Sequence, residues 1–366
     1  MDETRPLTVT WIVPTLTVAG GVKAIFGYAD RLGRRGHRSV LVWAAGSPLR
    51  RLIARWRGRG AVDWYPLETP LTPVTHLTPA AVPDGDAVIA TGWQTARFVA
   101  DLPPTKGRKL YFIQHDESLW AGPPDEVDAT YRLPLHPVVI SDWLRETLRP
   151  RLGRDADVLV TPVDDGGMGD DGGRSGTGPV RVGLLHHTFD WKGFDDGRKA
   201  FEAARARIPG LTLAVLGGRT PVPPVDAEYR YKPDAAGLRR FYRSCHVFLV
   251  PSWHEGLGMH AMEAMACGCA LVTTDTGGGR DFAVDGETAL VSPPRDVARL
   301  SENLVRAASD ADLRRRLSEA GARRIRAWTW SDQVTRLERI LRGEDGGTTN
   351  GQPPTTNKHP MVNGQP

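Results

Sequence analysis

The chain has 366 residues, of which 40% are hydrophobic and 25% are charged, and this length suits two globular domains better than one. Its formal net charge of +4 is too small to indicate a nucleic-acid partner. The three cysteines, Cys245, Cys267 and Cys269, are odd in number and form no Cys/His group with metal-ligand spacing. This argues against a disulfide framework and against a zinc site.

The N-terminal residues predict neither a signal peptide nor a membrane span. Acidic residues lead directly into a strand-like run, without the basic and apolar regions of a signal peptide. The sequence has no run of about 18 apolar residues. We therefore expect a cytoplasmic protein with reduced thiols, and peripheral association with a membrane stays open.

The first elements predict a βαβ unit. Thr8–Val13 is a short apolar run typical of a buried strand, and the loop after it contains Gly20 and Gly21. Val22–Arg35 has the pattern of a helix, and Ser39–Trp43 that of a second strand. A strand, a helix and a second strand in this order imply a parallel sheet.

A basic amphipathic stretch, Leu49–Arg59, follows. Its apolar residues share one helical face, Leu49, Leu52, Ile53 and Trp56, while its arginines lie largely elsewhere. One interpretation is a helix that lies on a membrane surface. We favour a helix that packs on the first sheet with its arginines in solvent, because the βαβ pattern requires a helix at this point.

Three more short apolar runs continue the first domain: Ala87–Thr91, Lys109–Gln114 and Pro137–Ile140. Polar loop residues or a helix, such as Asp142–Leu148, come after each of them. We expect these runs to be further parallel strands, whose carboxyl ends are where ligands bind in such sheets.

The domain boundary is predicted from composition. Residues 1–163 form the first domain, and 164–179 are almost entirely Gly, Asp and Ser, which is typical of a linker. Residues 180–329 form the second domain. A helix at about 330–342 completes the first domain, and the polar tail 343–366 is expected to be disordered.

The second domain repeats the α/β alternation. Strands are predicted at Val180–Leu185, Leu211–Leu216, Val247–Val250, Ala270–Thr274 and 288–291. Helices are predicted at 195–207, 237–244, 258–267, 296–308 and 311–326. The two halves are therefore similar α/β domains.

The segment Pro251–Gly268, PSWHEGLGMHAMEAMACG, is the most informative part of the sequence. A strand ends at Pro251, a glycine-containing loop follows, and a helix starts near Gly258. Glycine allows the main chain to approach a ligand closely. The free N–H groups near Gly258, Met259 and His260 would suit a diphosphate.

Two carboxylates flank this phosphate site. Glu255 lies before the helix, and Glu263 lies just over one turn inside it. Carboxylates would repel a phosphate unless they held something else, and they bind hydroxyl groups well. A nucleotide sugar carries hydroxyls on both sides of its diphosphate. The pattern therefore predicts a nucleotide-sugar site.

Glu255, seven intervening residues and Glu263 resemble the E-x7-E motif of the retaining GT-B glycosyltransferases of family 4, and the resemblance extends over residues 238–293. It implies two Rossmann-like domains that face each other across a cleft. Glu263 would hold the ribose hydroxyls and Glu255 would face the transferred sugar.

The resemblance also implies two cations for the diphosphate, and only one of them is present. Lys192-Gly193 matches the family's Lys-Gly, but His187 stands where the family has Arg. A neutral histidine would compensate less charge as the bond to the diphosphate breaks. Arg219 or Arg280 could supply the second cation.

In the first domain, the resemblance implies that Gly20 and Gly21 let the first loop approach the sugar and the acceptor. His115 ends a strand where relatives often have a histidine near the donor sugar, and its other interpretation is a hydrogen-bonded loop residue. We assign His115, Lys192 and Glu255 to catalysis. Gly21, His187, Gly258, Met259, His260 and Glu263 are assigned to donor binding, and Gly20 to the acceptor side.

The resemblance implies a hexosyltransferase that retains anomeric configuration and needs neither a metal nor another cofactor. A UDP-sugar is the default donor, with GDP- and dTDP-sugars as alternatives. The acceptor stays open between a small molecule, a glycan and a lipid-linked sugar, and so does the oligomeric state. Other candidates are a nucleotide-sugar epimerase, a phosphorylase, and an inactive nucleotide-sugar-binding module.

Overall fold

The computed structural model describes residues 5–58, 62–163, 178–218 and 225–344 and divides the chain into two domains. Domain 1 comprises the chain up to Thr161 and the segment that begins at Trp330, and domain 2 comprises Pro162–Thr329. Nearly all of the expected linker, most of the expected disordered tail, and Arg219 lie outside the described residues.

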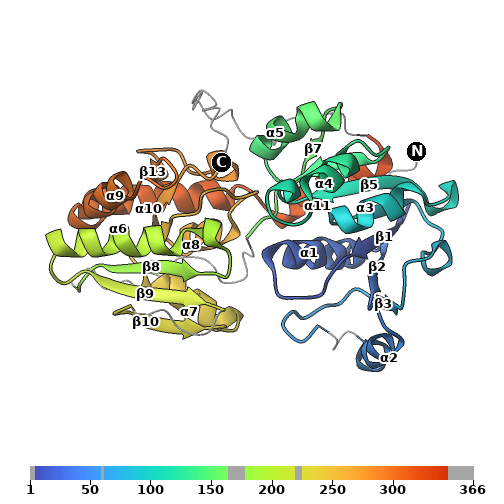
Figure 1. The fold of residues 1–366 in the computed structure, drawn as a ribbon, viewed down its shortest axis with the longest axis horizontal. Coiled ribbons are helices and arrows are strands. Elements are labelled where there is room, and N and C mark those ends of the chain that lie inside the picture. Colours follow the sequence, from blue (N-terminus) through green and yellow to red (C-terminus); the bar gives the residue numbers. More distant parts are fainter. Residues whose placement is uncertain (1–4, 59–61, 164–177, 219–224, 345–366) are drawn as a thin grey trace. The chain divides into compact units, whose positions relative to one another are not determined.

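Domain 1 is built on one parallel sheet with helices on both faces (Figure 1). Its strand order is β3-β2-β1-β4-β5-β6-β7. The strands are β1 Thr8–Val13, β2 Arg38–Ala44, β3 Leu71–Val74, β4 Ala87–Ala90, β5 Arg108–Ile113, β6 His136–Val139 and β7 Asp157–Val158. The helices are α1 Gly20–Arg34, α2 Pro48–Arg57, α3 Trp93–Ala100, α4 Pro124–Tyr131, α5 Asp142–Leu152 and α11 Trp330–Arg342.

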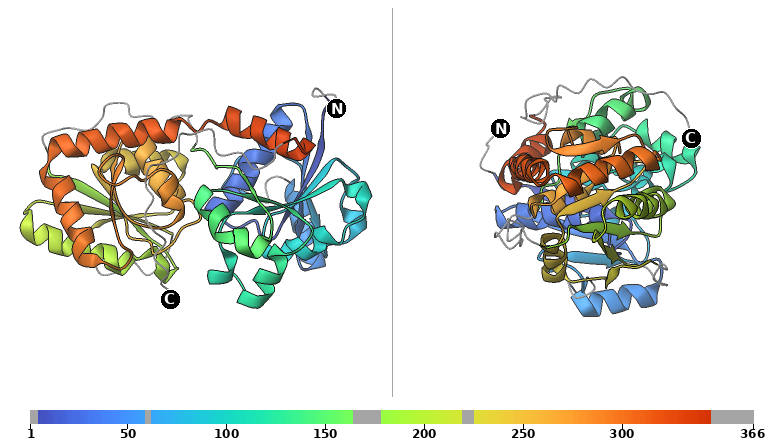
Figure 2. Two further views of the ribbon diagram at one scale, coloured as in Figure 1. Left: turned by 90° about the horizontal axis from the view of Figure 1, so that it is seen from above. Right: turned by 90° about the vertical axis from the view of Figure 1, so that its left-hand side faces the viewer.

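Domain 2 has a second parallel sheet, ordered β10-β9-β8-β11-β12-β13, also with helices around it (Figure 2). The strands are β8 Arg181–His186, β9 Thr212–Gly217, β10 Glu228–Tyr231, β11 Val247–Val250, β12 Ala270–Thr274 and β13 Ala289–Ser292. The helices are α6 Phe194–Arg207, α7 Ala235–Ser244, α8 Met259–Ala266, α9 Val297–Ser309 and α10 Ala311–Arg326. The strand order confirms the prediction of two Rossmann-like domains.

The elements that the sequence predicted are those with continuous apolar runs. All four residues of β11 are buried, as expected for a parallel strand covered on both faces. Phe201 of α6 and Leu304 of α9 are buried in the core over one face of this sheet. Short or polar elements were not predicted. They are β3, β7, α3, α4 and β10, which is largely exposed.

Helix α11 packs on α1 through a tryptophan that sits over a glycine. The ring of Trp330 contacts Tyr28 edge to face, with centroids 5.0 Å apart, and the Arg31 guanidinium lies 3.8 Å from its centroid. A Cβ on Gly27 would lie 2.7 Å from the Trp330 ring. The absence of a side chain at Gly27 therefore leaves space for the Trp330 ring and allows α11 to pack on α1.

Helix α2 does not pack as we expected. The expectation that its apolar face covers the sheet is wrong, because only Ala54 of this helix is buried. Trp56 is 86% exposed and Leu49 is 66% exposed. The helix lies beyond the edge strand β3 and contacts only this border of the sheet closely (Figure 1). None of the described helices, α2 included, has both the length and the apolar character that a bilayer crossing requires.

Two glycine substitutions on α1 should separate packing from helix propensity. Gly27→Ala should destabilise domain 1 by about 1–3 kcal/mol, because the new methyl group overpacks the contact with Trp330. Gly33→Ala should stabilise the same helix by about 0.5–1 kcal/mol, because nothing lies within 4 Å of a Cβ there. Urea unfolding of both variants measures the difference. Equal stability of the two variants would contradict this account of how α11 docks.

Candidate active site

The candidate site of domain 2 lies where the strand order reverses. Strands β8 and β11 are neighbours in the sheet but not in the chain, and the connections from their carboxyl ends run to opposite sides. Ligands of open parallel sheets bind at such a point. His187 and Lys192 follow β8, and Glu255 and Gly258 follow β11. The fold thus brings four of the assigned residues to one edge of the sheet.

Lys192 and Glu255 form an ion pair at this edge. Lys192 Nζ donates to both carboxylate oxygens of Glu255, at 2.7 Å each, and Ser252 Oγ donates to Glu255 Oε1 at 2.8 Å. The side chains are only 17% and 12% exposed. Because the pair is largely shielded from water, each charge depends on the other.

A glycine allows this close approach. Gly193 has φ 67°, in the left-handed region, and a Cβ there would lie 2.1 Å from the carbonyl oxygen of Pro251. A larger residue would push apart the turn that carries Lys192 and the loop that carries Glu255. Lys192-Gly193 is therefore a single structural unit.

Main-chain bonds hold Glu255 from both directions. Its N–H donates to the carbonyl of Thr276 at 2.8 Å, and its own carbonyl accepts from Gly278 N at 3.1 Å. Trp253 N donates to the carbonyl of Trp191 at 2.7 Å, which ties the loop to the turn before Lys192. The position of the carboxylate is thus set by the main chain as well as by the ion pair.

Helix α8 presents its amino end at the same edge. Gly258 caps it with φ 99° and ψ 54°, a conformation that favours glycine. The first intrahelical bond runs from Met262 N to the Gly258 carbonyl. The amides of Met259, His260 and Ala261 consequently have no partner within the helix, and they form a positive helix end.

Glu263 is buried on α8 beside a tyrosine of α7. Its side chain is 5% exposed, and Tyr242 OH donates to Glu263 Oε2 at 3.0 Å. His260 Nδ1 lies 2.8 Å from the same hydroxyl. A hydroxyl has one proton, so Nδ1 is the donor in the contact between His260 and Tyr242.

Tyr242 was not predicted from the sequence. It lies 21 residues before Glu263, and the two meet only because α7 packs against α8. Burial raises the pKa of the Tyr242 hydroxyl, and the neighbouring Glu263 charge raises it further. The hydroxyl thus stays protonated and orients the carboxylate.

His187 is a neutral group in this site. Burial, and then the charge of Lys192, lower the pKa of its imidazole to about 4. Phe189 N donates to Nδ1 at 3.2 Å, so the neutral ring carries its proton on Nε2. Arg280, which the sequence offered as a substitute cation, is engaged by both oxygens of Asp275, at 2.8 and 2.6 Å.

In domain 1 the assigned residues also gather at the carboxyl ends of strands. Gly20 and Gly21, which the sequence placed in the loop after β1, are instead the first residues of α1. A Cβ on Gly21 would lie 3.2 Å from the Gln114 side chain, so the start of α1 lies against the end of β5. His115 follows Gln114, and Trp120 Nε1 donates to its Nδ1 at 3.0 Å. The same Nδ1 also lies 3.0 Å from the carbonyl oxygen of Asp116, so the residues that follow His115 hold its ring.

The residues after His115 have structural roles. Asp116 is buried and accepts from Arg151 and from Ser118 Oγ. Burial alone would raise the pKa of Asp116, but these bonds bring it below its ordinary value. Glu117 accepts from Trp93 N at the start of α3, and burial raises the pKa of Glu117 to about 7. The anion position at that helix end is consequently filled by the chain itself.

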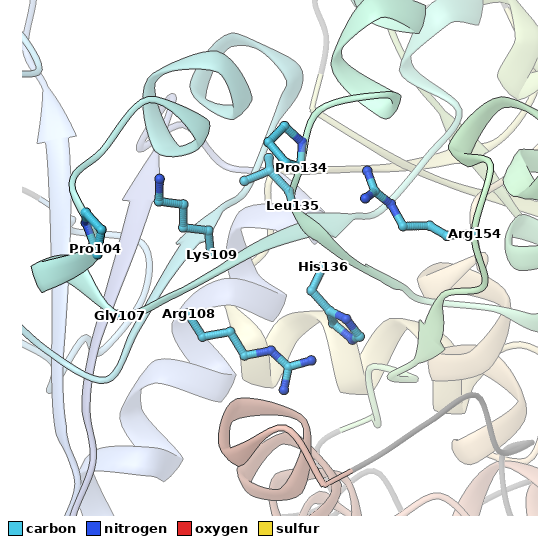
Figure 3. Close-up of a pocket in the computed structure, with 8 residues that line it drawn as sticks. All are labelled: Pro104, Gly107, Arg108, Lys109, Pro134, Leu135, His136 and Arg154. Atoms are coloured by element: carbon cyan, nitrogen blue, oxygen red, sulfur yellow. The ribbon is translucent and has the colours of Figure 1, made fainter.

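A cavity of about 560 Å³ lies at the other edge of the domain 1 sheet, where β5 and β6 begin (Figure 3). Arg108, Lys109, His136 and Arg154 line it. Three of these side chains donate to main-chain carbonyls: Arg108 to Ile340, Lys109 to Ala100 and Arg154 to Leu133. These side chains are thus engaged within domain 1, and the strands' carboxyl ends are at the opposite edge, so we do not assign the site here.

The described residues hold no group of three or more His, Cys, Asp or Glu side chains that could bind a metal ion. Cys245, Cys267 and Cys269 are all buried, and none of them forms a disulfide. The charged chemistry available at the candidate site is therefore that of Lys192, the two glutamates and the end of α8.

Residues 177–324, which lie within domain 2, match the family described as Glycosyl transferases group 1. The chain is 29% identical over 369 residues to the O-antigen biosynthesis protein RfbC of Myxococcus xanthus, covering 93% of this chain. It is 33% identical over 106 residues, 29% of this chain, to a D-inositol 3-phosphate glycosyltransferase of Thermomonospora curvata. It spans about a quarter of the length of these relatives, 27% and 25%.

Solved structures with the same fold include a UDP complex of Anabaena Alr3699/HepE, with a TM-score of 0.74 at 12% identity. This match covers 92% of the present chain and all of the other. Sucrose-phosphate synthase from Thermosynechococcus elongatus matches with a TM-score of 0.72 at 15% identity, over 93% and 99% of the two chains. The fold is therefore GT-B, two Rossmann-like domains, as the sequence predicted.

The charge state of His187 gives a pH prediction. In the folded protein its pKa is about 4, against 6.5 ordinarily, so the unfolded chain takes up this proton first on acidification. The free energy of unfolding should therefore decrease as the pH drops from about 6.5 to about 4. Above about pH 6.5 His187 is neutral in both states and should not affect stability in this way. Titration of the ring by NMR, assigned with His187→Gln, should give a midpoint near 4.

Lys192→Met should raise that midpoint, because the lysine charge is the second cause of the shift after burial. A wild-type midpoint near 6.5 would show that the ring is solvated and unaffected by Lys192. This result would contradict the placement of His187 in the site.

Proposed function

We propose that this chain is a glycosyltransferase that moves a sugar from a nucleoside diphosphate sugar to an acceptor hydroxyl and retains the anomeric configuration, as the resemblance to family 4 implies. The observation that carries the proposal is the meeting of Lys192, Glu255 and the amino end of α8 at the strand reversal of domain 2. The match of residues 177–324 to a glycosyltransferase family supports it.

In this proposal the donor diphosphate binds at the start of α8. The amides of Met259 and His260 would donate hydrogen bonds to the diphosphate. Gly258 has no side chain that would keep the diphosphate from these amides. Lys192 supplies the formal positive charge, and its present partner Glu255 then shares it with the phosphate. The helix end and one lysine thus stabilise the leaving diphosphate, without a metal in the proposal.

Glu255 and Glu263 are proposed to hold hydroxyls on opposite sides of that diphosphate. Glu263 is positioned by Tyr242, and its carboxylate is proposed to accept hydrogen bonds from the two hydroxyls of a ribose. Glu255 is held by Lys192 and Ser252, and is proposed to face the transferred sugar. Its charge would also favour a developing positive charge on that sugar.

The chemical step is proposed to be departure of the nucleoside diphosphate with attack by the acceptor oxygen from the same face of the sugar. The bond from the anomeric carbon to the phosphate oxygen breaks, the bond to the acceptor oxygen forms, and the acceptor proton passes to the departing phosphate. Catalysis then consists mainly of positioning and of stabilising the diphosphate. Neutral His187 contributes a hydrogen-bond donor, Nε2–H, in place of a second cation.

Domain 1 is proposed to serve the acceptor. Gly20 and Gly21 begin α1 without side chains, and His115 follows the end of β5. A uridine nucleotide is the first choice of donor, because Anabaena HepE of the same fold was solved with UDP and with UDP-glucose.

Two other enzyme classes predict different requirements. An epimerase would form product without an acceptor, and a phosphorylase would depend on inorganic phosphate.

The first test is nucleotide release from UDP-, GDP-, dTDP- and ADP-sugars by the purified chain. Lys192→Met should slow release by roughly 10²- to 10³-fold, because it removes the positive charge that stabilises the leaving diphosphate. Lys199→Met, an exposed lysine on α6, is the matched control and should react as the wild type does. If no sugar nucleotide is turned over or raises the melting temperature, the proposal fails.

A second test addresses Glu263 through the ribose. The wild type should bind UDP more tightly than 2′-deoxy-UDP by roughly 10-fold or more, as expected for a hydrogen bond to a charged group. Glu263→Gln should reduce this ratio toward one, while the Lys199→Met control keeps it. Calorimetric titration gives both affinities. An unchanged ratio in Glu263→Gln would remove the ribose from the role of this residue.

A further inference from the structure

Helix α2 has an apolar face that no described residue covers. Leu49, Leu52, Ile53 and Trp56 are 66%, 63%, 44% and 86% exposed. Local interactions set the start of the helix without tertiary packing. Ser47 Oγ caps it by accepting from Arg50 N, and Pro48 occupies its first position. It is a formed helix that presents a large tryptophan and three aliphatic side chains to its surroundings.

This apolar face points away from domain 1. At about 100° per residue, positions 49, 52, 53 and 56 fall on one side of the helix, and Ala54 falls roughly 150° from the centre of that side. Ala54 is the buried residue, so it marks the side that faces β3. Figure 1 and the right-hand view of Figure 2 both place α2 at the border of the domain, beyond β3.

Arginines flank the apolar face on both sides. By the same spacing, Arg50 and Arg57 lie along one border of it, and Arg55, with Arg51 farther round, along the other. All four are exposed, and no acidic residue occurs between Gly46 and Gly58. The surface is thus an apolar strip bordered by positive charge.

We propose that this surface, the α2 face, docks on an anionic lipid surface. The helix would lie in the plane of the interface, with Trp56 and the aliphatic side chains among the lipid tails and the arginines at the phosphates. Charge decides between possible occupants: a second copy of the helix would bring four more arginines against these four, whereas anionic headgroups neutralise them. This proposal does not depend on the proposed function.

Vesicle flotation with the full chain tests the proposal. Wild-type protein should float with vesicles of phosphatidylcholine and phosphatidylglycerol, and its bound fraction should drop strongly in vesicles of phosphatidylcholine alone or at high salt. Leu52→Ser with Trp56→Ser should reduce binding at least about tenfold, because burial of these side chains drives insertion. Arg51→Glu with Arg55→Glu should do the same through charge.

Matched variants keep the test specific. Val18→Ser changes an apolar residue that is 74% exposed, and Arg299→Glu with Arg315→Glu changes exposed arginines of α9 and α10. These should float as the wild type does, and so should Lys192→Met. The α2 variants should release nucleotide at the wild-type rate, which separates failure of docking from failure of the proposed function.

A dye attached at position 53 reports insertion directly. The three native cysteines are buried, so Ile53→Cys provides one accessible thiol for an environment-sensitive fluorophore. Its emission should shift to shorter wavelength with anionic vesicles. Equal binding to neutral vesicles, no binding to any vesicle, or self-association that Trp56→Ser abolishes would each overturn the proposal.

Discussion

The ion pair between Lys192 and Glu255 joins the two connections on which the candidate site depends. One follows β8 and the other follows β11, and the pair can form because these strands are neighbours where the strand order reverses. The ion pair also requires a glycine at position 193, because any side chain there would clash with the Pro251 carbonyl. Removing one partner of such a shielded pair typically costs about 3–5 kcal/mol, because the other charge stays behind unpaired.

The positive charge described at the site is that of one lysine and one helix end. His187 has a lowered pKa, so it adds a hydrogen-bond donor and no charge near neutral pH. Arg280 is held by Asp275. Among the described residues, the positive charge available to the proposed diphosphate therefore comes from Lys192 and the amides at the start of α8. This arrangement makes the site depend strongly on Lys192.

Domain 1 combines a parallel sheet with a helix, α2, that exposes apolar side chains at one border. The Trp330 contact with α1 secures the last described helix to this domain, and Arg151 and Asp116 support the loop that carries His115. At the β3 border, α2 leaves four apolar side chains uncovered between arginines. If domain 1 binds the acceptor and α2 binds lipid, the acceptor would be met at a membrane surface.

The sequence by itself determined the fold class and the main strands. Continuous apolar runs such as Val247–Val250 can only be buried parallel strands in this alternation, and the glycines at 193 and 258 mark turns that need their conformations. Edge elements such as β3 and β10 escaped prediction, because a short, half-exposed strand is stabilised by its neighbour and leaves little apolar signal. The spacing of Glu255 and Glu263 also identified a candidate site before its geometry was known.

Only the tertiary structure decided which side chains meet. Tyr242 reaches Glu263 because α7 packs on α8, and Lys192 reaches Glu255 because two distant strands pair. The orientation of α2 was beyond the sequence for the same reason. Its amphipathic pattern fits an inward or an outward apolar face equally well, and the contact of Ala54 at the β3 border turns that face outward.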